Sequence, residues 1–355
     1  MNYSHTKSRS RLIAKVLGGA WRSSPPELKC SLEELAEVAP LLLGSGAGAL
    51  AWWRIRNTTL QTTETAIELH QAYLLHTIHG SLFASKLKQA VALLRSNGVE
   101  PILIKGWAVA RLYPERGLRP YGDIDLCVSP DQYTKAKALL DSPEYKDYWV
   151  DLHEGLSRHD NSTWDELVKR SQLVKLDEIS VRILADEDHL RVLCVHWLGD
   201  GAWRPIQLCD IAAAVEAADS GFDWDVCLGR DKRRAKWVAS GIGLAQQLLG
   251  ARVEHCPLQV RAARMPRWLL PTVLRNWERP CIEDHRPPEL IMKTLRHPTR
   301  VPKALVVRWP DAIGATIRLK GSFNQCPRLP FQIGDYFIKN GKFLMRLPGL
   351  VRARR

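Results

Sequence analysis

The chain of 355 residues is 45% hydrophobic and 25% charged, which excludes a disordered protein and allows two modest domains, or one domain with large helical additions. The formal net charge of +13 arises in residues 257–355, which hold 20 Lys and Arg against 6 Asp and Glu, whereas the rest of the chain holds 31 against 32. The eight cysteines form no Cys-x-x-Cys pair, which excludes a zinc knuckle or a thioredoxin-like redox motif and favours the cytoplasm.

The N-terminal part of the chain is expected to be helical after a short tail. Residues 1–25 are predicted to form a flexible basic arm, and residues 26–98 an N-terminal helical region. Ser31 followed by Glu34 is the pattern of a capping box, which opens a helix. A long helix is predicted over residues 63–97, because apolar residues recur there at helical intervals before an Asn-Gly stop signal.

Residues 99–160 alternate between predicted strands and helices. Strands are expected at 99–104, 122–128 and 148–153, and helices at 106–113 and 130–140. The third strand is expected to lie antiparallel beside the second. This order indicates an α+β fold, in which a small mixed β-sheet carries mainly helical additions at both ends of the chain.

The remaining chain divides by composition. Residues 161–256 are predicted to be helical, and residues 257–355 hold 12 of the 21 prolines, a density expected to exclude long helices. A basic surface of this kind fits an anionic membrane surface or nucleic acid, or else a solvated tail without a specific partner. The longest apolar stretch, residues 35–53, is broken by a proline and three glycines, so no transmembrane segment is expected, and any membrane contact would be peripheral.

The most informative pattern is Asp-Ile-Asp at positions 123–125. Side chains two residues apart in a strand share one face, so Asp123 and Asp125 are expected to project side by side while Ile124 enters the core. Two parallel carboxylates repel each other and call for a cation, and Mg²⁺ is the usual hard ion where phosphates are handled. Asp151, flanked by apolar residues in the next predicted strand, is the candidate for a third carboxylate.

The turn before this strand carries groups suited to phosphate. Gly106 follows a strand and opens a helix, so backbone N–H groups there can approach an anion. Lys105 and Arg119 would supply positive charge, and Trp107 or Tyr121 could stack on a base.

These segments resemble the nucleotidyltransferase superfamily of the DNA polymerase β type, and within it a bacterial group of uncharacterised nucleotidyltransferase-like proteins. The resemblance covers roughly residues 30–250 and rests on Ile104-Lys105-Gly106, Arg119, the segment Gly122 to Leu126, Val150-Asp151-Leu152-His153, and His196-Trp197 with Leu208-Cys209-Asp210. It implies a polymerase-β-like fold and transfer of a nucleoside monophosphate from an NTP such as ATP to an acceptor hydroxyl, with Mg²⁺ or Mn²⁺ as cofactor. Where the superfamily usually has Gly-Gly or Gly-Ser, this chain has Gly106-Trp107.

The resemblance also implies roles for single residues. Asp123, Asp125 and Asp151 would be the catalytic residues and metal ligands; Lys105, Gly106, Trp107, Arg119 and Gly122 would bind the nucleotide and its phosphates; Tyr121, His153, His196 and Asp210 would lie at the cleft. Residues 99–160 would form the catalytic core, and residues 161–256 one wall of the substrate cleft. The acceptor could be a sugar or polysaccharide intermediate, a protein or a tRNA. The alternative is a catalytically degenerate module that binds a nucleotide or polyanion and docks through its basic C-terminal region.

Overall fold

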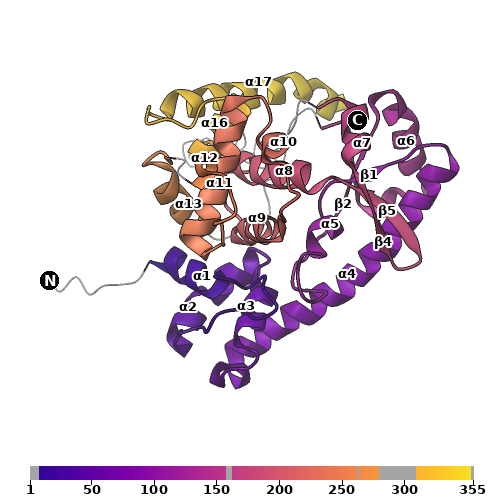
Figure 1. Ribbon diagram of the computed structural model, residues 1–355. Helices are drawn as coiled ribbons and strands as arrows, with labels where there is room; N and C mark the ends of the chain where they lie inside the picture. The colour runs from indigo at the N-terminus through magenta and orange to yellow at the C-terminus, as the bar shows by residue number, and fades with distance from the viewer. Residues whose placement is uncertain (1–7, 157–161, 262–263, 280–308, 353–355) are drawn as a thin grey trace.

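A five-stranded mixed sheet forms the centre of the part that carries the Asp-x-Asp motif (Figure 1). The computed structural model describes residues 8–156, 162–261, 264–279 and 309–352. The strands are β1 (Ile102–Leu103), β2 (Ile124–Val128), β3 (Val150–Glu154), β4 (Gln172–Leu176) and β5 (Ile179–Ile183), in the spatial order β3-β2-β1-β5-β4. Strand β1 runs antiparallel to β2 and parallel to β5, and β4 and β5 form an antiparallel hairpin. The predicted α+β class is therefore confirmed.

One face of this sheet is covered by helices α4 (Glu64–Ser96) and α6 (Tyr133–Leu140). The alternate residues Ile124, Leu126 and Val128 of β2 point into a core that also contains Leu87 and Leu94 of α4. The short helix α5 (Trp107–Ala110) follows β1, and α7 (Trp164–Arg170) precedes β4. The 3-10 turns are η1 (Thr59–Thr62), η2 (Pro130–Gln132) and η3 (Lys146–Tyr148).

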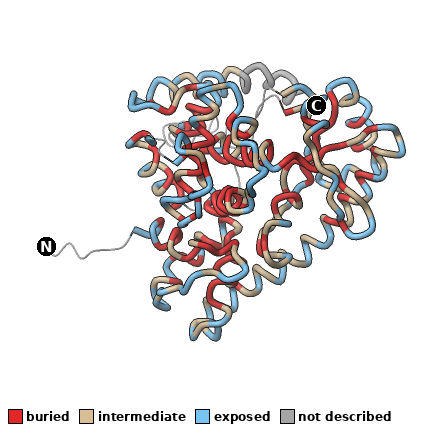
Figure 2. Tube along the Cα trace, in the orientation of Figure 1, coloured by how far each residue is buried: buried red, intermediate tan, exposed pale blue. Residues whose placement is uncertain are grey.

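A second and larger core lies among the helices beside the sheet (Figure 2). These helices are α1 (Arg9–Leu17), α2 (Leu32–Gly44), α3 (Gly48–Ile55), α8 (Asp186–Gly199), α9 (Pro205–Ala217), α10 (Trp224–Leu228), α11 (Lys232–Leu249), α12 (Leu258–Arg261), α13 (Leu269–Trp277) and α16 (Ala312–Arg318). Helix α17 (Leu329–Arg352) packs against α16. Segments far apart in the sequence meet here, since α1 packs against α11 and α13. No helix among the described residues is both long enough and apolar enough to cross a membrane.

The predictions for the N-terminal region were right about the helices and wrong about the arm. The capping box at Ser31 and Glu34 is present, and the long predicted helix is α4, with Thr63 as its N-cap and Asn97 as its C-cap. Within the predicted flexible arm, residues 9–17 form α1, and its residues Ile13 and Val16 are buried in the large core. Burial of this apolar stripe holds the segment in place. Residues 1–7 lie outside the described part of the chain.

Two further predictions from local pattern were wrong. Strands β4 and β5 lie in the segment that was expected to be helical. They are two short stretches of alternating apolar and polar residues, joined by a two-residue connection in which Asp177 has φ 51°. The C-terminal region contains the 24-residue helix α17, although its proline content was expected to exclude long helices. Pro330 occupies the second position of α17, where its missing N–H removes no intrahelical hydrogen bond. Residues 280–308, which hold five of the prolines, are outside the described residues.

Candidate active site

The candidate site is built on the pairing of β2 with β3. These strands are parallel, not antiparallel as expected, because α6 crosses back over the sheet between them and returns the chain in the same direction. Asp125 and Asp151 occupy the same register position in the two strands, so their side chains lie side by side on one face. The parallel pairing therefore brings Asp151, the predicted third carboxylate, next to Asp125.

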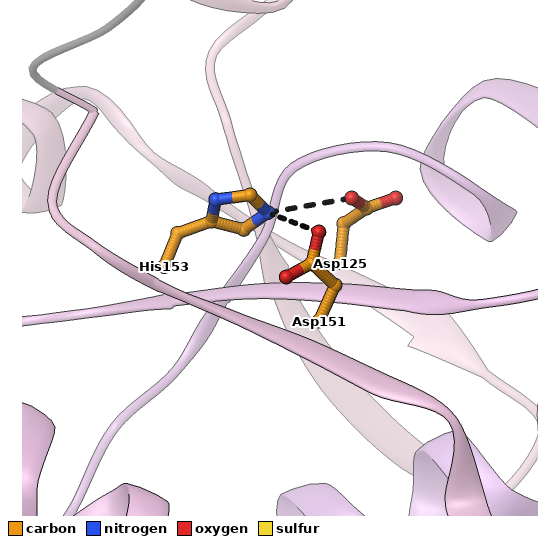
Figure 3. Close-up of side chains that lie close together, drawn as sticks. All are labelled: Asp125, Asp151 and His153. Atoms are coloured by element: carbon orange, nitrogen blue, oxygen red, sulfur yellow. Dashed lines mark hydrogen bonds and ion pairs between the residues drawn. The ribbon is translucent and has the colours of Figure 1, made fainter. Parts of the chain in front are cut away.

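His153 lies between these two carboxylates (Figure 3). Its Nε2 atom is 3.4 Å from Oδ1 of Asp125 and 3.3 Å from Oδ2 of Asp151. One ligand atom from each of the three residues falls within 4.8 Å of the other two. Asp125 is buried, His153 is partly buried, and the side chain of Asp151 is 60% exposed, so the cluster opens to solvent on the β3 side.

Asp123 lies just before β2 and on the same side of the strand as Asp125, because side chains alternate. Its side chain remains exposed, but partial loss of hydration raises its pKa, and the nearby charges of Asp125 and Asp151 raise it further. The positive charge of Lys105 opposes this effect. Asp123 therefore lies within electrostatic range of Asp125 and Asp151, but the ligand atoms that lie within 4.8 Å of one another come from Asp125, Asp151 and His153 and do not include its oxygens.

Asp125 is the carboxylate most tightly bound by its surroundings. Burial would raise its pKa, but the hydrogen bond from His153 and the charge of Lys105 outweigh burial and lower the pKa to about 2. The ammonium of Lys105 lies 2.8 Å from Oδ1 of Asp125. Lys105 was expected to bind phosphate, but in the structure its ammonium forms an ion pair with the buried carboxylate of Asp125.

The glycine turn packs directly against the motif. Gly106 has φ 62° and ψ −115°, a conformation that a residue with a side chain adopts only with strain. A Cβ atom at this position would lie 3.4 Å from the backbone oxygen of Asp123. Trp107 packs at the edge of the sheet core, and Gly122 is exposed next to Asp123. The predicted phosphate turn and the carboxylates are therefore adjacent.

Arg119 binds Asp210 of α9 through two nitrogens. Its Nε lies 3.1 Å from Oδ1 and its Nη2 2.7 Å from Oδ2, and the hydroxyl of Tyr113 donates to Oδ1 at 2.7 Å. Burial followed by the charge of Asp210 raises the pKa of Tyr113 well above its ordinary value, so the phenol stays protonated. Arg119 was predicted to bind phosphate and Asp210 to lie at the cleft. In the structure the two form one buried ion pair, which connects the loop before Asp123 to α9.

Tyr121 is held against α4. Its hydroxyl donates to the carbonyl of Gly80 at 3.0 Å, and its ring meets that of Phe83 edge-on at 6.0 Å between centroids. Tyr121 is therefore part of the contact that fixes the loop entering β2.

The C-terminal end of α8 supplies two more polar groups. Nε2 of His196 lies 3.3 Å from Oδ2 of Asp200. Burial and then the charge of Lys105 lower the pKa of His196 to about 4, whereas burial raises the pKa of Asp200 and Lys105 opposes that rise. Lys105 and Asp125 both influence His196, so this pair lies within electrostatic range of the carboxylates. Asp200 was not predicted; its only sequence signal was its position four residues after His196.

The depressed pKa of His196 predicts a loss of stability in acid. The unfolded chain binds a proton at this histidine below about pH 6.5, whereas the folded protein does so only near pH 4, so the stabilisation is complete above pH 6.5 and is lost as the pH falls toward 4. The expected loss is about 3 kcal/mol, measured as the urea-unfolding free energy against pH. His196→Gln should flatten this slope. A slope in the variant equal to that of the wild type would contradict the assignment.

The comparisons with known proteins agree with this geometry. The model of an uncharacterised nucleotidyltransferase family matches residues 45–250, which is more than half of the 355-residue chain and includes the whole site. Neither curated proteins nor solved structures gave a match. The chain belongs to this family of uncharacterised nucleotidyltransferases.

Proposed function

We propose that the protein is a metal-dependent nucleotidyltransferase that moves a nucleoside monophosphate from an NTP to an acceptor hydroxyl. The observation that carries this proposal is the parallel register of β2 and β3, which lines up Asp125 with Asp151 and puts His153 within 3.4 Å of both. Asp123 adds a third carboxylate at the same end of β2.

The donor set fits a divalent cation. Carboxylate oxygens are the ligands of Mg²⁺ and Mn²⁺, and an imidazole nitrogen is accepted more readily by Mn²⁺ than by Mg²⁺. Asp125, Asp151 and His153 would supply the ligand atoms that lie together, and Asp123, the other predicted ligand, would complete the set from beside them. When bound, the cation would offset charge on the transferring phosphate and ease deprotonation of the acceptor hydroxyl.

The chain's own groups would position the reactants. Lys105 keeps Asp125 ionised and, with three donor protons on its ammonium, could contact a phosphate without leaving that carboxylate. Gly106, Trp107 and Gly122 would line the phosphate side, with Arg119 behind them and Tyr121 beside the base. Asp151 is the most exposed of the paired groups, so we assign it to orienting the acceptor hydroxyl and taking its proton. His196 and Asp200 would face Asp151 from the C-terminal end of α8.

The acceptor is proposed to be a sugar or polysaccharide intermediate, a protein or a tRNA.

For the basic C-terminal region we propose contact with a polyanionic surface, either anionic lipid or nucleic acid. The described part of α17 exposes Leu329, Ile333 and Phe337 at four-residue spacing, and its acid Asp335 is buried against Arg318 at 2.7 Å. Such a face suits the interface of an anionic membrane, and binding to vesicles or to RNA should weaken steeply with added salt.

A labelling experiment tests the enzyme against the binding module. Purified protein is incubated with each labelled NTP and Mg²⁺ or Mn²⁺, alone and with cell extract. Transfer of label that disappears in Asp123→Ala and Asp125→Ala supports the enzyme, and the mass of the labelled product identifies the acceptor class. Nucleotide binding without transfer to any acceptor, in any extract, would instead support the catalytically degenerate module.

His153→Ala is expected to weaken Mn²⁺ binding about tenfold and Mg²⁺ binding less, because an imidazole nitrogen favours the softer ion. Mn²⁺ affinity can be read from the electron paramagnetic resonance of the free ion without any assay of activity. His255→Ala is a suitable control, since its Nε2 bonds the carbonyl of Val215 at 2.9 Å. Equal losses for the two metals would assign His153 a role in orienting Asp125 and Asp151 only.

A further inference from the structure

Helix α4 exposes an apolar face that no other described part of the chain covers. Five large aliphatic side chains on it are about half or more exposed: Ile67 (54%), Leu74 (48%), Leu75 (51%), Ile78 (66%) and Leu82 (51%). The opposite face of the same helix is buried, with Leu69 in the large core and Leu87 and Leu94 in the sheet core. In Figures 1 and 2, α4 is the long helix along one edge of the molecule, with exposed and intermediate residues through its middle.

The five side chains form one continuous stripe. At about 100° per residue they fall within an arc of about 100°, over a length of about 22 Å. Gln71 is the only other side chain between Ile67 and Leu82 that falls within this arc. Soluble monomers rarely leave a contiguous apolar surface of this kind in water. The stripe therefore points to a macromolecular partner with a matching apolar face.

The charges at the two ends of the stripe identify which partner fits. Glu64 lies eleven residues before Leu75, and Lys86 lies eleven residues after it, both on the striped side of the helix. Two copies of α4 packed antiparallel about Leu75 therefore place Glu64 of one copy opposite Lys86 of the other, twice by symmetry. A parallel pair would instead set Glu64 against Glu64. The ammonium of Lys86 donates to the carbonyl of Asp147 at 2.8 Å and retains protons for a further partner.

We propose that the protein forms a twofold-symmetric dimer through antiparallel packing of α4 against α4 of a second copy. The pattern is self-complementary, with an apolar seam, a central Leu75 and opposite charges at equal distances from it, as an isologous interface requires. This inference does not depend on the proposed catalytic activity.

The dimer would also support the candidate site. On another side of α4, the carbonyl of Gly80 accepts a hydrogen bond from Tyr121 at 3.0 Å, and Thr77 Oγ1 bonds the carbonyl of Arg116 at 3.3 Å. These contacts hold the loop that leads into Asp123. A second copy packed on the stripe would therefore stiffen the helix that carries this loop.

Sedimentation of the full-length protein over a concentration series tests the proposal. The wild type is expected to be a dimer, and Ile78→Lys a folded monomer by circular dichroism. The control is Leu258→Lys on α12, where the side chain is equally exposed at 70% but lies outside the stripe; it should remain dimeric. A wild type that stays monomeric, or an Ile78→Lys variant that still dimerises, would overturn the proposal.

Charge reversal tests the antiparallel geometry separately. Glu64→Lys and Lys86→Glu should each weaken dimerisation about three- to tenfold, because each change creates two like-charge contacts, and the double variant should restore it. A dimer that forms through the stripe but responds equally to the single and double variants would overturn the antiparallel arrangement.

Discussion

Asp125→Asn is expected to reduce nucleotidyl transfer by at least ~10³-fold, since a metal-bound carboxylate supplies several kcal/mol of charge stabilisation in such reactions. Asp125 is the centre of the candidate site: its pKa is about 2, Lys105 lies 2.8 Å away, and His153 is at 3.4 Å. Asparagine keeps the shape of the side chain and removes its charge, so Lys105 loses its counter-ion. The rate of label transfer to the acceptor is the measurement.

The matched control for this prediction is Asp188→Asn. Asp188 is also a buried aspartate in an ion pair, with Arg170 at 2.9 Å, but it lies in the first turn of α8, at the other end of that helix from His196 and Asp200. Its replacement should lower stability and leave transfer largely intact. Retained transfer in Asp125→Asn, or an equal loss in the control, would mean that the Asp-x-Asp motif does not carry the chemistry.

The second large effect is expected on stability, at the pair of Arg119 and Asp210. Asp210→Asn should lower the free energy of unfolding by about 3–5 kcal/mol, because it leaves the Arg119 guanidinium buried without its carboxylate. Tyr113→Phe should cost about 1–2 kcal/mol, since it removes only the hydroxyl that donates to Asp210 at 2.7 Å. Urea unfolding monitored by tryptophan fluorescence gives both values.

An exposed pair is the reference for this measurement. Lys137 and Asp141 form an ion pair of 2.8 Å at the C-terminal end of α6 with side chains more than half exposed, and Asp141→Asn should change stability by less than about 1 kcal/mol. If Asp210→Asn is as mild as this control, Arg119 finds another partner. That result would favour its predicted role as a phosphate ligand over a structural one.

Features that depend on neighbours in the chain could be read from the sequence. The capping box at Ser31 and the ends of α4 at Thr63 and Asn97 follow from hydrogen bonds that span three or four residues. The alternation around Asp123 and Asp125 predicted which side chains would enter the core, because a strand repeats every two residues. Family membership followed from the same local motifs.

Only the tertiary structure decided how these motifs meet. Whether β3 runs parallel or antiparallel to β2 depends on the path of the chain through α6, and that choice brings Asp151 and His153 to Asp125. The partner of Arg119 is 91 residues away, and no local pattern specifies it. Contacts at such separations are set by the packing of whole elements against each other, so the sequence alone proposed the chemical groups of the candidate site, and the fold determined how these groups pair.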